Sequence, residues 1–249
     1  MAGKLSERLH QLIKEKGAIH MTLLDPQKTC SSVCAEIAGE ACKGGTSAIM
    51  VGGSTLASNS DLDHAVSEIK KNVDVPVILF PNNVSGVSKD ADAIWFMSLL
   101  NSRNTYYIIN VQALTSPVIK KYGLEALSLG YIIVGSGGAA GYVGEANGIP
   151  YDHPELAVGY SLAGELLGMQ FIYLEAGSGA KAPVPLEMIG AVRKYLTVPL
   201  VVGGGIRDGP AAAAAVKAGA DIIVTGTLVE EADKVRERIY DIVSHIESV

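Results

Sequence analysis

The residue types best suited to chemistry in this chain are two carboxylates and three glycine-rich turns. Asp25 and Glu175 each stand at the end of an apolar run. Each turn follows a short apolar run in the second half of the chain, and together the turns contain Gly177, Gly179, Gly204, Gly205, Gly226 and Thr227. Glycine lets backbone N–H groups approach a ligand closely, and such groups favour an anion. The turns therefore predict a binding site for a phosphate.

Glu175 ends a run, residues 171–175, that is otherwise apolar. Burial of a carboxylate at such a place costs free energy unless the group is paired or used. Because Gly177 and Gly179 follow at once, we favour a role in which Glu175 orients a substrate hydroxyl or accepts its proton. The alternative is an ion pair with a buried cation, such as Lys181 or Arg207.

Asp25 precedes Pro26 and offers hard carboxylate oxygens, which suit Mg²⁺. Ser54 follows the next apolar run and could add a hydroxyl oxygen to the same ion. The alternative is structural, because Asp before Pro is common in turns and Ser is a frequent helix cap. Position alone leaves both interpretations of this pair open.

These groups follow apolar runs that are typical of strands buried on both faces. Eight such runs cover residues 18–24, 48–51, 77–80, 93–97, 131–134, 171–175, 200–202 and 222–225. Helical patterns occupy residues 31–43, 62–71, 105–121, 154–167, 185–196, 209–218 and 230–246. The alternation over 249 residues predicts an α/β protein, a single (β/α)8 TIM-barrel domain over residues 1–249. Active sites of this fold lie at the C-terminal ends of the strands.

One unit of the alternation is irregular. Only residues 81–92 connect the third and fourth runs, and they are rich in Pro, Asn, Ser and Gly. A parallel crossover needs about a dozen residues, usually with a helix. We therefore expect the third outer helix to be missing or replaced by an extended segment, which leaves an apolar groove beside Trp95, Phe96 and Met97. An ordinary tight loop is the alternative.

Composition excludes several classes of function. The net charge is -6 without a basic run, so we expect no nucleic-acid partner. The three cysteines, Cys30, Cys34 and Cys42, have no partners at zinc-ligand spacing, and we expect small core residues. The first 16 residues are charged and amphipathic rather than a signal segment, and no window is apolar enough to span a membrane. We expect a cytoplasmic protein.

Five motifs together resemble the geranylgeranylglyceryl phosphate synthase family of archaea, over essentially the whole chain. They are the segments 20–26 (HMTLLDP), 51–55 (VGGST), 173–179 (YLEAGSG), 202–207 (VGGGIR) and 226–227 (GT). The segment 173–179 is the most specific of them. The resemblance implies a Mg²⁺-dependent prenyltransferase on a barrel whose third helix is replaced. Such an enzyme joins the 3-hydroxyl of sn-glycerol 1-phosphate to geranylgeranyl diphosphate, releases pyrophosphate and makes the first ether bond of archaeal membrane lipids.

The resemblance also implies roles for individual residues. Glu175 and Asp25 are the implied catalytic residues, and Asp25 and Ser54 the implied metal ligands. The implied glycerol phosphate site contains Tyr173, Leu174, Glu175, Ala176, Gly177, Ser178, Gly179, Gly204, Gly205, Gly226 and Thr227. Related members often carry a second acid where this chain has Gln27. We therefore expect Mg²⁺ to arrive with the diphosphate and to keep several waters.

The resemblance further implies self-association into a homo-oligomer and transient contact with a membrane surface when the lipid product leaves. Two other functions remain alternatives. An isomerase or epimerase on a small phosphorylated metabolite would need a second acid, base or lysine at the strand ends. A non-catalytic phosphate-binding module would need the glycines but not Glu175.

Overall fold

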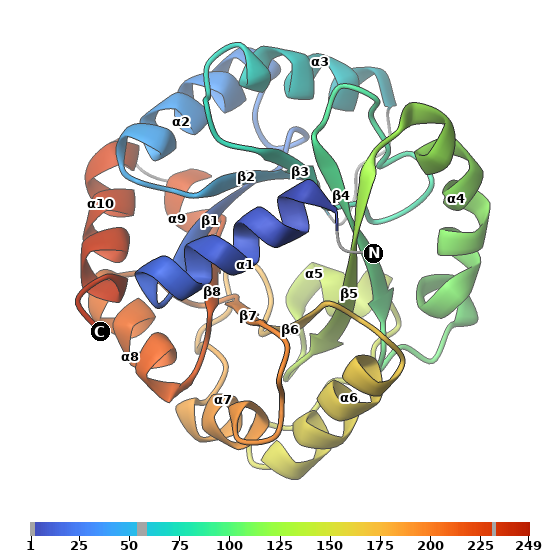
Figure 1. The fold of residues 1–249 in the computed structure, drawn as a ribbon, viewed down its shortest axis with the longest axis vertical. Coiled ribbons are helices and arrows are strands. Elements are labelled where there is room, and N and C mark those ends of the chain that lie inside the picture. The colour runs from blue at the N-terminus through green and yellow to red at the C-terminus, as the bar shows by residue number, and fades with distance from the viewer. Residues whose placement is uncertain (1–2, 54–58, 231–232) are drawn as a thin grey trace.

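Eight parallel strands form a closed barrel in the computed structural model, which describes residues 3–53, 59–230 and 233–249 (Figure 1). The strands are β1 (Ile19–Leu24), β2 (Ala48–Val51), β3 (Val77–Leu79), β4 (Ala93–Leu99), β5 (Glu125–Ile133), β6 (Phe171–Glu175), β7 (Leu200–Gly203) and β8 (Ile222–Thr225). They lie in sequence order, and β8 pairs with β1 to close the barrel. The predicted barrel is confirmed.

The strands are apolar on both faces because each packs against two different layers. On β8, Ile222 and Val224 pack in the barrel interior, whereas Ile223 packs between the strands and the outer helices. This alternation follows from the two-residue period of a strand. Strand β5 begins at Glu125, six residues before the predicted run, and pairs with β4 from Ala93 to Leu99. The sequence missed this start because Ser128 and Gly130 interrupt the apolar pattern.

Helices surround the barrel and match most of the expected pattern. They are α2 (Ser31–Lys43), α3 (Asn59–Lys70), α4 (Val111–Tyr122), α5 (Gly138–Val143), α6 (Pro154–Leu166), α7 (Leu186–Arg193), α8 (Gly209–Ala218), α9 (Thr227–Glu230) and α10 (Val235–Ile246). A π-helix, η1 (Tyr106–Asn110), precedes α4 where the sequence predicts one continuous helix. Cys34 is buried, but Cys30 is exposed at the start of α2, so the expectation of a core position is wrong for Cys30. No helix of the described residues is long and apolar enough to cross a membrane.

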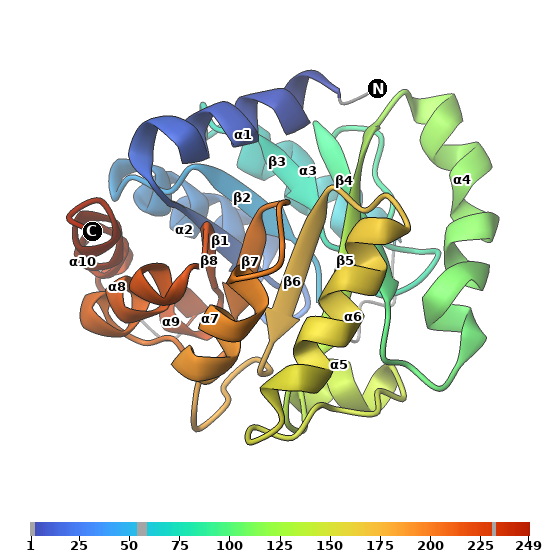
Figure 2. The same cartoon turned by 60° about the horizontal axis from the view of Figure 1, so that its bottom comes forward.

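The N-terminal helix α1 (Lys4–Lys16) lies across the end of the barrel where the strands begin (Figures 1 and 2). Leu9 is fully buried in the barrel interior. The carboxylate of Glu125 accepts hydrogen bonds from the N–H groups of Leu5 (2.9 Å) and Ser6 (2.8 Å), which stabilises the positive end of the helix. Since α1 closes this end, ligands have access from the opposite end of the strands.

Residues 80–92, which connect β3 and β4, contain no helix. The predicted replacement of the third outer helix by an extended segment is therefore confirmed. Val87 and Ala91 of this segment are buried against the outer face of the sheet. Asp92 ends the segment and accepts a hydrogen bond from the N–H of Val77 (2.9 Å) while it pairs with Lys70 (2.6 Å). These contacts hold the segment in place without a helix.

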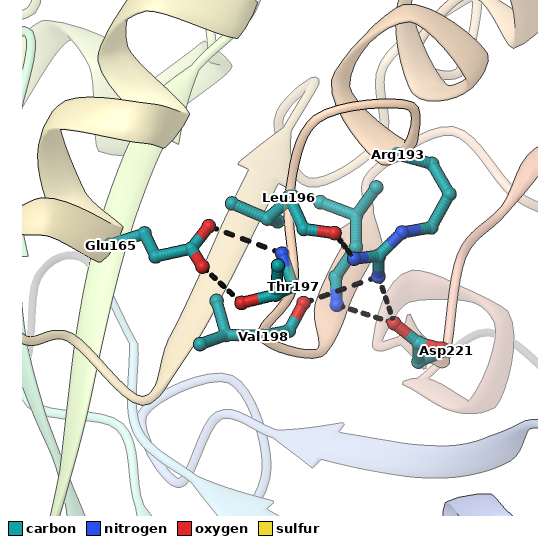
Figure 3. Close-up of polar contacts among 7 residues, drawn as sticks. Glu165, Arg193, Leu196, Thr197, Val198 and Asp221 are labelled. Atoms are coloured by element: carbon teal, nitrogen blue, oxygen red, sulfur yellow. Dashed lines mark hydrogen bonds and ion pairs between the residues drawn. The ribbon is translucent and has the colours of Figure 1, made fainter.

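A polar network ties α6, α7, β7 and β8 together near the starts of the strands (Figure 3). The Arg193 guanidinium donates to the carbonyl oxygens of Leu196 and Val198 and pairs with Asp221 at 2.8 Å. The same Asp221 oxygen accepts the N–H of Leu200 at 2.7 Å. Burial raises the pKa of Asp221, and the Leu200 N–H and Arg193 oppose that rise. The charge of Asp221 therefore depends on its partners.

Replacement of Arg193 by leucine is expected to lower the free energy of unfolding by about 2–4 kcal/mol, because it leaves Asp221 without a cation and removes donors from two carbonyls. Urea denaturation at pH 7 measures this loss. Lys217 on α8 is exposed and forms no ion pair with a described residue, so Lys217→Leu is the control and should stay within about 0.5 kcal/mol. Equal losses in the two variants would contradict a structural role for the Arg193 network.

Candidate active site

A cavity of about 630 Å³ lies where the strands end, opposite α1. Its wall on the side of β6, β7 and β8 is polar, with Glu175 and the glycine-rich turns. Its wall on the side of β4 and α4 is mostly apolar. The residues on that side are Val87, Ile94, Trp95, Phe96, Met97, Leu99, Tyr107, Val111, Gln112 and Thr115. One continuous cavity thus joins a candidate anion site to an apolar groove.

Glu175 lines this cavity from the end of β6 and is buried, with 6% of its surface exposed. Its Oε1 accepts a hydrogen bond from the N–H of Gly177 at 2.6 Å, and the Tyr173 hydroxyl also bonds to the carboxylate. Burial raises the pKa of Glu175, while these two hydrogen bonds lower it. No described lysine or arginine, Lys181 and Arg207 included, forms an ion pair with Glu175. The alternative of a buried ion pair is therefore wrong.

Three aromatic rings form the wall beside Glu175. Tyr131 lies 5.1 Å from Tyr173 and 5.6 Å from Phe80, measured between ring centroids, with edge-to-face geometry in both pairs. Burial raises the pKa of both tyrosines well above the ordinary value, and the nearby charge of Glu175 adds to the rise. Both hydroxyls therefore keep their protons, and that of Tyr173 donates to Glu175.

Glycines make room for these groups. A methyl group added at Gly203 would lie 2.1 Å from the Tyr173 hydroxyl oxygen. One added at Gly204, whose φ is +81°, would lie 2.6 Å from Oε1 of Glu175. Any side chain at either position would displace a group of the candidate site. Gly203 at the end of β7 and Gly204 after it therefore serve the packing of Tyr173 and Glu175 as well as the approach of a ligand.

The glycine-rich turns meet along one wall. Ser178, Gly179, Gly204, Gly205, Gly226 and Thr227 all line the cavity. The side-chain oxygens of Ser178 and Thr227 lie 3.0 Å apart, which joins the turn after β6 to the turn after β8. The N–H groups of Gly204, Gly205 and Gly226 donate no hydrogen bond to another described residue. Unused N–H groups that face a cavity are the donors that an anion requires.

Three residues of the predicted glycerol phosphate site lie elsewhere. Leu174 and Ala176 are buried between the sheet and the outer helices, because strand alternation turns them away from Tyr173 and Glu175. The N–H of Gly177 is already used by Glu175. Leu174, Ala176 and Gly177 therefore lie behind the residues of the cavity wall and do not line the cavity.

Asp25 lines the cavity directly after β1, the strand that pairs with β8, and is 9% exposed. Its Oδ1 accepts the N–H of Gln27 at 3.1 Å, and a methyl group added at Gly53 would lie 2.3 Å from its carboxyl carbon. Ser54, the second predicted metal ligand, lies outside the described residues. Within the described ranges, no group of three His, Cys, Asp or Glu side chains could hold a metal ion. Asp25 thus offers a single carboxylate to a ligand in the cavity.

Several residues of the cavity were missed by the sequence. Tyr107 lies on the π-helix, which is pinned to β4 because the Gln112 amide donates to the carbonyl oxygens of Met97 (2.5 Å) and Tyr107 (3.2 Å). Arg207 and Arg238 also line the mouth. Arg207 stands two residues after the glycines of the turn, and the sequence named it only as a possible ion-pair partner of Glu175. Tyr107, Gln112 and Arg238 left no sequence signal.

The chain matches the PcrB family over residues 10–246. A geranylgeranylglyceryl phosphate synthase of Thermofilum pendens is 51% identical over 243 residues, which cover 98% of this chain and 95% of that protein. One of Methanococcoides burtonii is 52% identical over 244 residues, which cover 98% and 99%. The similarity to proteins of this kind therefore extends over nearly the full length.

Solved structures agree with the sequence relatives. A crystal structure of (S)-3-O-geranylgeranylglyceryl phosphate synthase from Thermoplasma acidophilum, in complex with its substrate sn-glycerol-1-phosphate, is 39% identical, with a TM-score of 0.96 over all of both chains. A thiamine phosphate pyrophosphorylase from Pyrococcus furiosus has a TM-score of 0.61 over 94% of this chain and 98% of its own. At 16% identity that protein shares the fold alone.

Removal of the Tyr173 hydroxyl is expected to raise the pKa of Glu175 further, because it deletes a hydrogen bond that favours the ionised carboxylate. A carbon-13 NMR titration of carboxyl-labelled glutamate in Tyr173→Phe measures the shift, and the signal is assigned from its absence in Glu175→Gln. Tyr131→Phe is the control, because Tyr131 does not bond to the carboxylate and its loss should leave the pKa nearly unchanged. Equal shifts in both variants would contradict the assignment of the hydrogen bond.

Proposed function

This chain belongs to the PcrB family, and we propose that it transfers the geranylgeranyl group of geranylgeranyl diphosphate to the 3-hydroxyl of sn-glycerol 1-phosphate. The products are geranylgeranylglyceryl phosphate and pyrophosphate. One observation carries the proposal: a single cavity joins an anion-binding wall to an apolar groove, with the buried Glu175 between them. A substrate that is charged at one end and a second one with a long apolar tail match these two parts.

We propose that the phosphate of glycerol phosphate binds at the glycine-rich wall, where the N–H groups of Gly204, Gly205 and Gly226 donate to no described residue. The hydroxyls of Ser178 and Thr227 add donors, and Arg207 lies at the rim. Since the overall charge is -6, local donors rather than a broad positive field must hold the anion. With the phosphate there, the glycerol hydroxyls extend toward Glu175.

In the proposed reaction the bond between prenyl C1 and the diphosphate oxygen breaks, and a bond between C1 and the glycerol 3-oxygen forms. The hydroxyl oxygen must lie about 3–3.5 Å from C1 while positive charge develops there. Glu175 orients the hydroxyl and accepts its proton, and its raised pKa makes it a better base than an ordinary carboxylate. The wall of Phe80, Tyr131 and Tyr173 excludes water, which would otherwise capture the allylic cation.

We propose that Mg²⁺ is the cofactor and that Asp25, with Ser54, holds it. A single carboxylate in the cavity suits an ion whose other ligands are diphosphate oxygens and waters, as Mg²⁺ prefers. Such an ion neutralises the charge that the leaving diphosphate gains. Asp25 contributes a fixed oxygen because the N–H of Gln27 bonds to its Oδ1 and Gly53 packs against its carboxyl group.

We propose that the prenyl tail lies in the groove between residues 80–87 and α4. On β4, Ile94 and Phe96 face this outer side, while Ala93 and Trp95 face the barrel interior. Burial of the tail contributes about 0.8 kcal/mol per methylene-sized group, so a tail of this length supplies much of the binding energy. The absence of a helix over residues 80–92 is what leaves room for it.

We further propose a homo-oligomer in the cytoplasm that contacts a membrane surface when the product leaves. Large apolar side chains are exposed on η1 and α4, including Ile109 (59%) and Leu114 (63%), and a partner subunit would cover them. The phosphorylated substrate is water-soluble, whereas the product carries a tail that partitions into lipid. No nucleic-acid partner is expected at a net charge of -6.

Incubation with radiolabelled geranylgeranyl diphosphate, sn-glycerol 1-phosphate and Mg²⁺ tests the function. The label should appear in an ether-linked phospholipid, with one pyrophosphate released for each product, and omission of Mg²⁺ should abolish transfer. Glu175→Gln should lower kcat by at least about 100-fold and leave the affinity for the prenyl diphosphate within threefold, because only proton transfer and orientation are lost. Absence of product from the wild-type protein, or full activity of Glu175→Gln, would contradict the proposal.

A tryptophan at position 94 should shift preference toward shorter prenyl diphosphates, because Ile94 lines the groove and faces outward. The ratio of kcat/KM for farnesyl over geranylgeranyl diphosphate should rise at least about tenfold, since an excluded isoprene unit forfeits several kcal/mol of burial. Val84→Trp is the control, because Val84 is 46% exposed and does not line the cavity. An equal change in Val84→Trp, or a loss of glycerol phosphate affinity in Ile94→Trp, would contradict the location of the groove.

A further inference from the structure

A buried polar cluster lies in the barrel wall beside the turn that follows β8. His20 on β1 is 1% exposed, and its Nδ1 lies 3.0 Å from Oγ1 of Thr46. Its Nε2 lies 2.9 Å from Oγ1 of Thr225, the last residue of β8. The Thr22 hydroxyl donates to Oγ1 of Thr46 at 3.1 Å. One imidazole therefore connects β8 to the start of β2 across β1, and the proposed reaction makes no use of it.

The hydrogen bonds determine which ring nitrogen carries the proton. The Thr46 hydroxyl lies 3.2 Å from the carbonyl oxygens of both His20 and Ala48, and its single hydrogen is donated to one of them. Thr46 Oγ1 then accepts the Nδ1–H of His20, which leaves Nε2 as the acceptor for the Thr225 hydroxyl. Burial lowers the pKa of His20 to about 3, so the ring is neutral at physiological pH. The imidazole is thus a fixed acceptor for Thr225.

Thr225 connects this cluster to the cavity. Val224 faces the barrel interior, so strand alternation turns the Thr225 side chain outward to His20. Thr225 also lines the cavity, together with the next residues, Gly226 and Thr227. Thr227 in turn contacts Ser178 across the anion-binding wall at 3.0 Å. Among the described residues, the side-chain hydrogen bond that joins the cluster to this wall is the one between His20 and Thr225, in addition to the backbone pairing of β1 with β8.

We propose that His20 is a positioning residue for phosphate recognition, acting through Thr225 to fix the turn that presents Gly226 and Thr227. The inference rests on the proposed function, which assigns the phosphate of glycerol phosphate to that turn. Glycine allows many backbone conformations, so the free N–H of Gly226 needs support from behind to point at the anion. The prenyl diphosphate, bound near Asp25 and β4, does not depend on this support.

Two variants, His20→Gln and His20→Asn, test the contacts of the two imidazole nitrogens separately. The Gln side-chain amide extends to the place of Nε2 and retains a partner for Thr225, whereas the shorter Asn amide reaches the place of Nδ1 and contacts only Thr46. Isothermal titration calorimetry measures binding of sn-glycerol 1-phosphate and of geranylgeranyl diphosphate to both. We expect His20→Asn to lose about tenfold in affinity for glycerol phosphate, the effect of one lost hydrogen bond, and His20→Gln to stay within about threefold. Affinity for the diphosphate should stay within about threefold in both.

Two threonine variants test the same inference with almost no change of volume. Thr225→Val should reproduce the His20→Asn loss, since it deletes the contact from the other side. Thr22→Val removes a hydroxyl from the same cluster but keeps the bond between His20 and Thr225 and the backbone pairing of residue 22 with Thr225. It should lower Tm while both affinities are retained. Equal glycerol phosphate affinities in the Gln and Asn variants, or a tenfold loss in Thr22→Val, would overturn the positioning role. A wild-type protein that binds no glycerol phosphate would instead overturn the assignment of the phosphate site.

Discussion

The mouth of the barrel is organised around a carboxylate that is buried without a cation. Burial raises the pKa of Glu175, and the hydroxyl of Tyr173 and the N–H of Gly177 are the groups that oppose this rise and favour its ionised form. An ionised group in such surroundings is stable only if its donors are fixed, since a misplaced donor leaves it unsolvated. The turn after β6 must therefore bend back on the strand, and Tyr173 must lie in the interior. The aromatic wall and the glycines at the end of β7 are arranged around these two requirements.

The two ends of the barrel satisfy backbone hydrogen bonds in different ways. Where the strands begin, side chains supply the missing partners: Glu125 caps α1, Asp92 binds the N–H of Val77, and Asp221 binds that of Leu200. Where the strands end, the N–H groups of Gly204, Gly205 and Gly226 have no partner among the described residues. Stability and function are thus separated along the axis of the barrel, as is general for this fold. Where the strands end, a bound ligand would accept the backbone hydrogen bonds that side chains accept where the strands begin.

The sequence predicted the barrel and the missing third helix because both leave local signals, namely apolar runs and a short connection rich in turn residues. Glu175 could be singled out because one acid stands out in an apolar strand. By contrast, a run that is apolar throughout does not indicate which face a residue occupies, so Leu174 and Ala176 were assigned to the site together with Tyr173. Helix α1 was missed as the closure of the barrel, since its partner Glu125 lies 120 residues away. Arg238 was missed because only the folded chain brings α10 to the cavity.

Gly53, Gly203 and Gly204 have a consequence for how this protein can evolve. Each lacks a side chain at the place where an added carbon would collide with Asp25, Tyr173 or Glu175, respectively. A substitution at one of these glycines is therefore harmful while its partner is present and becomes tolerable only after the partner has changed. Such pairs make the effect of one mutation depend on another. New activities on this scaffold are then more accessible through the apolar groove, where single substitutions act independently, than through the polar wall.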